Sequence, residues 1–180
     1  MHPKALFLYG TNKEDGTPNF GLFTWITSCW NGEYSIMACI GEPKLTKDRI
    51  LAEKVFSANL VNEALLPLAD YMGHTPGHTP GKMDIPVNIG RGKVLDVPVL
   101  NDSPLTYELE VTKLIPLAEE SIILVCGIRN EIKAKELENI ASIEECLRLT
   151  KPVVSVGQEY FTFEPISKGN WGKWKDVYKK

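Results

Sequence analysis

The residues best suited to binding chemistry lie in the segment 41–50, where an apolar run ends and a short amphipathic helix begins. Thr46 is the expected N-cap of this helix, and Asp48 falls in its first turn, where the helix dipole favours negative charge. The first backbone N–H groups of a helix have no partner within it, so they attract anions. Lys44 and Lys47 add two cations. The segment could therefore hold one phosphate group, although a capped helix with two surface lysines would have the same sequence.

Histidines offer few alternatives for catalysis. His74 and His78 lie in a segment rich in glycine and proline, residues 72–83. Pro76 lies between them and is incompatible with a helix that would bring both rings to one metal ion. We therefore expect no metal site. We interpret 72–83 as a long loop that could gate a neighbouring site, where either histidine could contact a substrate.

Cysteine spacing and known catalytic motifs exclude several other classes of site. The four cysteines form no C-x-x-C pair, so we expect no structural zinc, but reduced and buried thiols in a cytoplasmic protein. The dinucleotide fingerprint G-x-G-x-x-G, the P-loop and the G-x-S-x-G elbow are absent. The cysteines are Cys29, Cys39, Cys126 and Cys146.

Length and charge narrow the remaining possibilities. The chain has 180 residues, 43% of them hydrophobic, and a net charge of −3. We expect a single domain over residues 1–180, with a tail from about residue 166. The slight excess of acidic residues argues against nucleic acid as a partner, because binding phosphates needs clustered Lys and Arg. No apolar run approaches the roughly 18 residues of a membrane span.

Strands surround the short helix in the predicted arrangement. The strongest signal is an antiparallel hairpin of residues 22–30 and 34–40, joined by Asn31-Gly32 in a type I′ turn. Six or more strands with two or three short helices indicate a closed or partly closed β-barrel rather than a doubly wound sheet. Further strands are expected over 55–61, 93–98, 105–114, 121–129, 152–156 and 160–163, and further helices over 62–72 and from the capping box at Ser142 to about Leu149.

Three short segments occur in an order that resembles the flavin-reductase-like family, which includes flavoredoxin and the FMN-binding split-barrel proteins. The family pattern has an Asn and then Ser or Thr followed by Trp in the first hairpin strand. A basic residue and a Ser or Thr then open the first helix, and a Phe-x-x-Asn strand follows. The resemblance covers about residues 1–165 and implies a six-stranded Greek-key split β-barrel, a homodimer, and FMN at or near the subunit interface. The segments are Asn19-Phe-Gly-Leu-Phe-Thr-Trp25, Cys39-Ile-Gly-Glu-Pro-Lys-Leu-Thr-Lys-Asp-Arg-Ile50 and Phe56-Ser-Ala-Asn-Leu60.

The resemblance also implies roles for individual residues. The flavin ring or ribityl chain would be contacted by Thr24, Trp25, Cys39, Ile40 and Gly41. The phosphate would be held by Lys44, Thr46 and Lys47. Asn59 would lie near the ribityl chain or the ring edge, and Lys82 and Met83 would belong to the loop that approaches the isoalloxazine. The sequence departs from the family pattern at Leu22, where many members have a hydroxyl, and at Lys44, where others have Arg.

We therefore predict an FMN-binding flavoprotein that reduces flavin with NADH or NADPH by hydride transfer to the flavin N5. The isoalloxazine itself performs this chemistry, so the reaction does not need a catalytic histidine or a carboxylate pair. Two alternatives stay open. One is a flavoredoxin-like electron carrier without reductase activity of its own, and the other is a split-barrel module that binds haem or another ligand.

Overall fold

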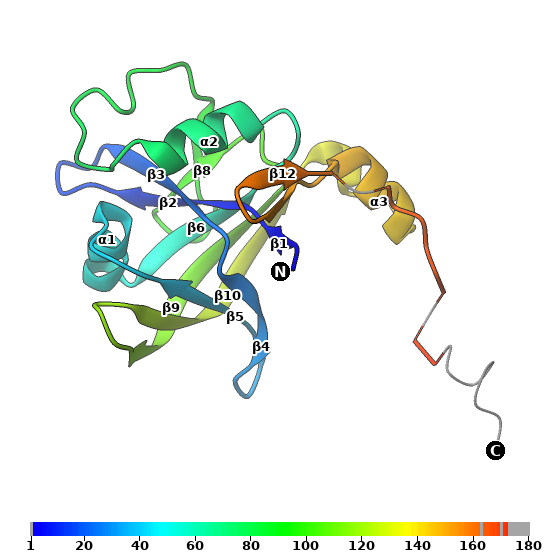
Figure 1. Cartoon of the computed structure of the whole chain (residues 1–180), viewed down its shortest axis with the longest axis horizontal. Helices are drawn as coiled ribbons and strands as arrows, with labels where there is room; N and C mark the ends of the chain where they lie inside the picture. The colour runs from blue at the N-terminus through cyan, green and yellow to red at the C-terminus, as the bar shows by residue number, and fades with distance from the viewer. Residues whose placement is uncertain (1, 163, 170, 173–180) are drawn as a thin grey trace.

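Seven antiparallel strands form the main sheet of the computed structural model, which describes residues 2–162, 164–169, 171 and 172 (Figure 1). Neighbouring strands in the sheet are hydrogen-bonded throughout. In sheet order they are β3 (Pro18–Phe23), β2 (Phe7–Asn12), β6 (Val55–Leu60), β9 (Leu105–Pro116), β10 (Ile122–Lys133), β5 (Tyr34–Ile40) and β4 (Ile26–Trp30).

The two edge strands, β3 and β4, follow each other in the chain and are separated only by Thr24 and Trp25. A sheet whose opposite edges are joined so closely must curl until those edges meet. Beyond β4 the ladder continues for one bond, in which the Cys39 N–H donates to the Trp25 carbonyl oxygen at 2.8 Å. Counted as one interrupted strand, β3 and β4 correspond to one of the six strands of the predicted split barrel. The predicted fold class, mainly β with short helices, is confirmed.

Aromatic and aliphatic side chains fill the interior of the curled sheet. Tyr9 stacks on Phe23 with ring centroids 4.4 Å apart and packs at a tilt against Phe56. Alternation from Ile36 along β5 places Ile36, Ala38 and Ile40 in this core and leaves Cys39 on the opposite face. The core therefore fixes which side chains of β5 are available for binding.

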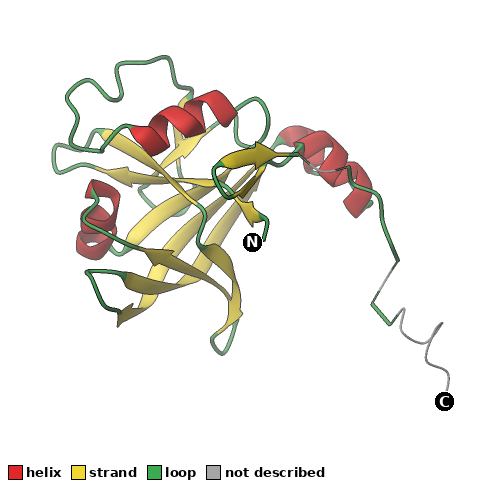
Figure 2. Cartoon of the chain, viewed as in Figure 1, coloured by secondary structure: helices red, strands yellow, loops and turns green. Residues whose placement is uncertain are grey.

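Among the described residues, three α-helices lie outside the sheet (Figure 2). The first, α1 (Leu45–Glu53), packs on β2 and β3. The second, α2 (Leu66–His74), packs mainly on β3 and covers a second apolar cluster that includes Met72. The third, α3 (Ile143–Thr150), is capped as predicted, since the Glu145 N–H donates to the Ser142 Oγ at 3.3 Å. None of the described helices is long and apolar enough to span a membrane.

The start of α1 differs from the prediction. The N-cap is Lys44 rather than Thr46, and Lys44 makes no capping hydrogen bond through its side chain. The Thr46 hydroxyl is buried inside the first turn, where it accepts a hydrogen bond from the Asn19 amide on β3. Asp48 lies in the first turn as predicted. Thr46 therefore does not cap α1. Its hydroxyl oxygen accepts a hydrogen bond from Asn19 on β3, rather than from a backbone N–H of the helix.

The predicted hairpin is present, but its first strand and its turn differ in detail. The strand expected over 22–30 is interrupted at Thr24 and Trp25, where it passes from one edge of the sheet to the other. Trp30 pairs with Tyr34, so the turn has three residues rather than two. Within it only Gly32 has a positive φ, at 79°, which excludes the predicted type I′ turn.

The strand predicted over 93–98 is wrong for residues 93–97, and only Pro98 belongs to a strand. The backbone N–H groups of Lys93, Val94 and Leu95 instead donate to the carboxylate of Glu108 on β9. Short strands flank this loop: β7 (Ile89–Arg91) and β8 (Pro98–Leu100), which pair with each other. The backbone N–H groups of this segment are therefore satisfied by the buried Glu108 carboxylate and not by a neighbouring strand.

Other expected elements are shifted or shortened. The helix expected over 62–72 begins at Leu66 and extends to His74, so His74 is helical and the loop begins after it. Near the C-terminus, β11 (Val154–Val156) and β12 (Glu159–Phe161) are shorter than expected and form a small sheet with β1 (Lys4–Ala5). Of the expected strand over 160–163 and the expected tail over 166–180, residues 163, 170 and 173–180 lie outside the described residues.

All four cysteines are unpaired, but only Cys126 is buried. Burial, with a smaller contribution from Cys29, raises the pKa of the Cys126 thiol to about 12. The expectation that all four thiols are buried is therefore wrong. Within the described part of the chain, no three His, Cys, Asp or Glu side chains gather where they could hold a metal ion.

Candidate functional site

Two pockets that share one wall lie between β3, the turn after β5 and the segment that follows α2. The wide pocket has a volume of about 420 Å³ and the narrow pocket about 260 Å³, both in or near the range of small-ligand sites. Their common wall consists of Leu22, Phe23, Pro43 and Lys44. A ligand of two chemically different halves could therefore occupy both pockets at once.

The wide pocket has an aromatic and an acidic side. Trp25, 56% exposed, lines it together with Thr24, Cys39 and Gly41. Its other side is formed by Glu42, Glu119 and Ser121. Local sequence patterns did not indicate these three residues. Glu42 follows β5, and Glu119 and Ser121 belong to the β9–β10 turn, which the pairing of Ile122 with Ile40 brings beside it.

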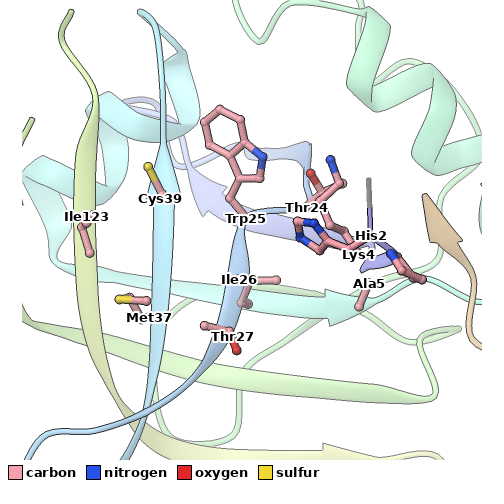
Figure 3. Close-up of a pocket in the computed structure, with 11 residues that line it drawn as sticks. His2, Lys4, Ala5, Thr24, Trp25, Ile26, Thr27, Met37, Cys39 and Ile123 are labelled. Atoms are coloured by element: carbon pink, nitrogen blue, oxygen red, sulfur yellow. The ribbon is translucent and has the colours of Figure 1, made fainter. Parts of the chain in front are cut away.

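A third pocket, the outer pocket, adjoins the wide pocket at Trp25 and has a volume of about 390 Å³. Figure 3 shows Trp25 standing between strands, with Cys39 and Ile123 on one side and His2 and Lys4 on the other. Thr24, Trp25 and Cys39 line both this pocket and the wide pocket. Trp25 can therefore contact a molecule bound in either pocket.

The narrow pocket is basic. It is lined by the N-terminal turn of α1, the end of α2, the loop up to His78, and Lys82. Lys44 lies at the boundary between the narrow and wide pockets, and its ammonium is 3.2 Å from the carboxylate of Glu42. Thr46 contributes its hydroxyl, and His74 lies at the last turn of α2. None of the residues that line this pocket is acidic.

Lys82 is the most deeply buried cation of the narrow pocket, with 2% of its surface exposed. Its ammonium donates to the carbonyl oxygens of Phe20 at 2.7 Å and Met72 at 3.3 Å. No ion pair links it to a carboxylate within the described residues. Burial, with a smaller contribution from Lys13, lowers the pKa of the Lys82 ammonium to about 8. The ammonium is therefore still mostly protonated at pH 7.

Two predicted site residues point away from the pockets. The Lys47 ammonium donates to the Glu120 carbonyl oxygen at 2.9 Å, and the side chain is buried there, so it cannot reach a phosphate at the start of α1. Asn59 is fully buried, and its amide makes four hydrogen bonds to other parts of the barrel. No atom of the Asn59 side chain is free for a ribityl chain. Its partners are the Leu8 carbonyl, the Ser57 hydroxyl, the Leu100 N–H and the Thr106 hydroxyl.

Two further predicted residues have a more limited role than expected. The Ile40 side chain lies in the barrel core, so only its backbone could face a ligand. Met83 packs against the apolar cluster under α2 and lines none of the three pockets described above. Lys82 does line a pocket, but it is the narrow basic one rather than the aromatic one. His78 lines the narrow pocket with His74.

Comparison with protein families settles the family relationship. The model of the flavin reductase like domain matches residues 1–142. The chain belongs to the flavin reductase like family. The resemblance seen in the three sequence segments is thereby confirmed.

Solved structures share the fold of this flavin reductase like chain at low sequence identity. A flavoredoxin from Methanosarcina acetivorans is 15% identical, with a TM-score of 0.84 over 98% of this chain and 93% of that one. An FMN-binding protein from Thermus thermophilus is 18% identical, with a TM-score of 0.78 over 94% and 91%. An NADH:FAD oxidoreductase of Streptomyces globisporus is 12% identical, with a TM-score of 0.73 over 90% and 87%. No curated protein matches the sequence.

The joined pockets fit a flavin nucleotide. The planar ring needs an apolar slot, which Phe23 and Trp25 border in the wide pocket. The phosphate needs cations and N–H donors, which the narrow pocket supplies through Lys44, Lys82 and the first turn of α1. The aromatic and basic ends of the groove therefore match the two ends of the cofactor expected for this family.

Proposed function

We propose that this chain binds FMN without a covalent bond and acts as an NAD(P)H-dependent flavin reductase. The observation that carries the proposal is the pair of joined pockets, of which one is bordered by aromatic side chains and the other is basic and contains no carboxylate. Flavin binding by this family supports the first half of the proposal, and the NADH:FAD oxidoreductase with the same fold supports the second.

In this proposal the chain's own residues bind and orient the cofactor. Lys44, the Thr46 hydroxyl and the free N–H groups of α1 hold the phosphate. Trp25 and Phe23 border the ring, and the Cys39 and Gly41 backbone lies beside it. The flavin, when bound, supplies the hydride chemistry itself. The protein therefore contributes positioning, exclusion of water and charge rather than an acid or a base.

The outer pocket supports the reductase over a simple carrier. It shares Thr24, Trp25 and Cys39 with the wide pocket, and its volume would accept a nicotinamide ring. An electron carrier needs only an exposed ring edge, whereas a reductase needs a second binding space for the nicotinamide. We place the nicotinamide in the outer pocket.

We also propose a homodimer with the flavin near its interface. Large apolar side chains are exposed on the β4–β5 hairpin, where Trp30 is 77% and Tyr34 59% exposed. Ile115 and Leu117, at the end of β9, are also exposed. Exposed apolar groups of this kind are typical of surfaces that bind another protein. A second copy that covers them would also approach Trp25.

The spectrum of the purified full chain, followed by anaerobic titration with NADH and NADPH, tests the proposal. We expect the two visible absorption bands of oxidised flavin, and their bleaching by at least one nucleotide. Flavin bands that neither nucleotide bleaches would leave the electron carrier as the function. A Soret band, or a colourless protein that takes up no FMN, would contradict flavin binding altogether.

A further inference from the structure

Five residues other than glycine have a positive φ in the described part of the chain. Lys54 and Lys151 have an ordinary explanation, because they are the left-handed C-caps of α1 and α3. The other three are glutamates: Glu42 at 61°, Glu119 at 56° and Glu120 at 59°. Glu42 and Glu119 both line the wide pocket. Left-handed backbone is unfavourable for a residue with a Cβ, so contacts from the surrounding structure must stabilise it here.

Glu119 and Glu120 are the central residues of the tight turn between β9 and β10. The turn is closed by the Ser121 N–H, which donates to the Ala118 carbonyl oxygen at 3.1 Å. Positive φ at both central positions is typical of type I′ turns, for which Asn-Gly is a favoured pair. Two glutamates therefore form a turn that their own backbone preferences oppose.

Lys47 on α1 contacts this turn from outside. Its ammonium donates to the Glu120 carbonyl oxygen at 2.9 Å, and only 6% of its surface is exposed. Within the described residues it forms no ion pair with a carboxylate. A hydrogen bond from a charged donor is about twice as strong as one between neutral groups. The buried ammonium can therefore offset the cost of the left-handed residues.

The β9–β10 turn forms one wall of the wide pocket, because Glu119 and Ser121 line it. The same wall lies close to the indole. A Cβ added to Gly41 would be 3.4 Å from the Ser121 Oγ and 3.6 Å from the Cζ3 of Trp25, so both side chains approach Gly41. A turn that relaxed from its left-handed conformation would therefore alter the aromatic end of the groove.

From these contacts we infer that Lys47 is a positioning residue for the flavin ring. Its ammonium holds the β9–β10 turn in a conformation that the two glutamates disfavour, and the turn completes the slot for the isoalloxazine. This inference rests on the proposed flavin binding. It gives Lys47 a role at the ring end of the cofactor, while Lys44 and Thr46 hold the other end. The first turn of α1 thus serves both ends.

Amide hydrogen exchange of the full chain without flavin tests whether Lys47 holds the turn. The probes are the Ser121 N–H and the Leu117 N–H, which donates to the Ser121 carbonyl oxygen at 2.9 Å. In Lys47→Met both should exchange at least about tenfold faster than in the wild type. Lys54→Met is the matched control, because the Lys54 ammonium also donates to a backbone carbonyl, that of Leu51, but lines none of the three pockets. Unchanged exchange in Lys47→Met would overturn the inference.

Titrations with FMN and riboflavin, followed by flavin fluorescence, test the role in ring binding. The two ligands share the ring and differ by the phosphate, so a weakened ring slot should affect both by the same factor. We expect Lys47→Met to raise both dissociation constants roughly tenfold, with their ratio within about twofold of the wild type, and Lys54→Met to change neither. Loss of affinity for FMN alone would indicate a phosphate contact and contradict the ring role. Faster exchange with both constants unchanged would also contradict it.

Replacing Glu120 by Gly provides a rescue that a general loss of stability would not show. Glycine adopts a positive φ without strain, so the turn no longer depends on the ammonium. Glu120 lines none of the three pockets, so its removal deletes no direct contact with a ligand. The double variant Lys47→Met/Glu120→Gly should regain slow exchange and wild-type affinity for both flavins. A double variant that regains neither would refute the inference.

Glu120→Pro keeps the test decisive if Lys47→Met does not fold. Proline cannot adopt a positive φ, and Glu120 is exposed, so this variant disrupts the turn without changing the buried lysine. Affinity for both flavins should fall equally, and unchanged affinity would overturn the inference. If the wild type binds neither flavin, the proposed function fails and the ring role fails with it. If the wild type binds FMN and Lys47→Met binds both flavins equally well, only the inference about Lys47 is wrong.

Discussion

Replacing Glu108 by Gln tests the buried carboxylate that organises the loop between β7 and β8. Glu108 lies on β9 and has no exposed surface. One carboxylate oxygen accepts the Lys93 N–H and the Asn130 amide, both at 2.7 Å. The other accepts the N–H groups of Val94 at 2.9 Å and Leu95 at 2.6 Å. The amide nitrogen of Gln would face two of these donors, so two hydrogen bonds are lost and two lose their charge.

The expected loss of stability follows from these four bonds. Hydrogen bonds to a charged group contribute about 1.5–3 kcal/mol each, so Glu108→Gln should lower the free energy of unfolding by roughly 3–5 kcal/mol. For a chain of this length that corresponds to a fall in thermal midpoint of roughly 10 °C. Urea denaturation monitored by tryptophan fluorescence measures the free energy directly.

The Glu108 carboxylate also makes the free energy of unfolding fall as the pH is lowered into the acid range. Burial raises the pKa of Glu108, but its hydrogen bonds outweigh burial and hold the pKa below the ordinary value of 4.5. The stabilisation is therefore present above pH 4.5 and is lost as the pH falls through the lower value of the folded state. In Glu108→Gln this part of the acid dependence should disappear.

Glu110 provides the matched control, since it lies on the same strand and is partly exposed. Its carboxylate is 2.6 Å from the Arg129 guanidinium, and both side chains are in contact with solvent. Glu110→Gln should cost at most about 1 kcal/mol, as surface ion pairs do. Equal losses for the two variants would refute the view that Glu108 organises the loop.

Three further predictions concern the barrel and its surfaces. Asn59→Ala should cost roughly 2–4 kcal/mol of stability, because it leaves several buried partners unsatisfied, while flavin affinity of the folded protein stays near that of the wild type. The free energy of unfolding of the wild type should rise relative to that of Lys82→Gln by up to about 3 kcal/mol from pH 8 to 10.5. The reason is that the pKa of Lys82 is lower in the folded than in the unfolded chain, so the folded state loses the buried charge first. A pH-independent difference would contradict a buried ammonium. Trp30→Lys should shift the chain from dimer to monomer in sedimentation, and an unchanged dimer would show that the hairpin face is not the interface.

Local patterns were enough to predict much of the fold. The period-two alternation of residues 105–114 and the apolar run of 121–129 correspond to β9 and β10, although both strands are longer. The Ser142 cap was also recognisable, because a capping residue and its partner are neighbours in sequence. These features depend on contacts within a few residues, where periodicity and side-chain chemistry are decisive.

The site was predicted less completely, since its geometry depends on contacts between distant segments. Lys44 lines the phosphate end as expected, whereas Lys47 turns onto the β9–β10 turn. Thr46 does not cap α1 because Asn19 on β3 binds its hydroxyl. Nothing near Lys82 in the sequence shows that its ammonium reaches the carbonyl of Phe20. Strand register and loop path decide these contacts, and neither can be read from a local pattern.

Titration of the purified full chain with FMN, followed by flavin fluorescence, tests whether the joined pockets bind the cofactor. We expect saturable binding of one FMN per chain. Replacing Lys44 and Thr46 together by Ala should weaken that binding by roughly 2–4 kcal/mol, from one charge-assisted and one hydroxyl hydrogen bond. Absence of saturable FMN binding to the wild type would refute the proposed flavin site. Affinity unchanged in the double variant would show that the start of α1 does not hold the phosphate.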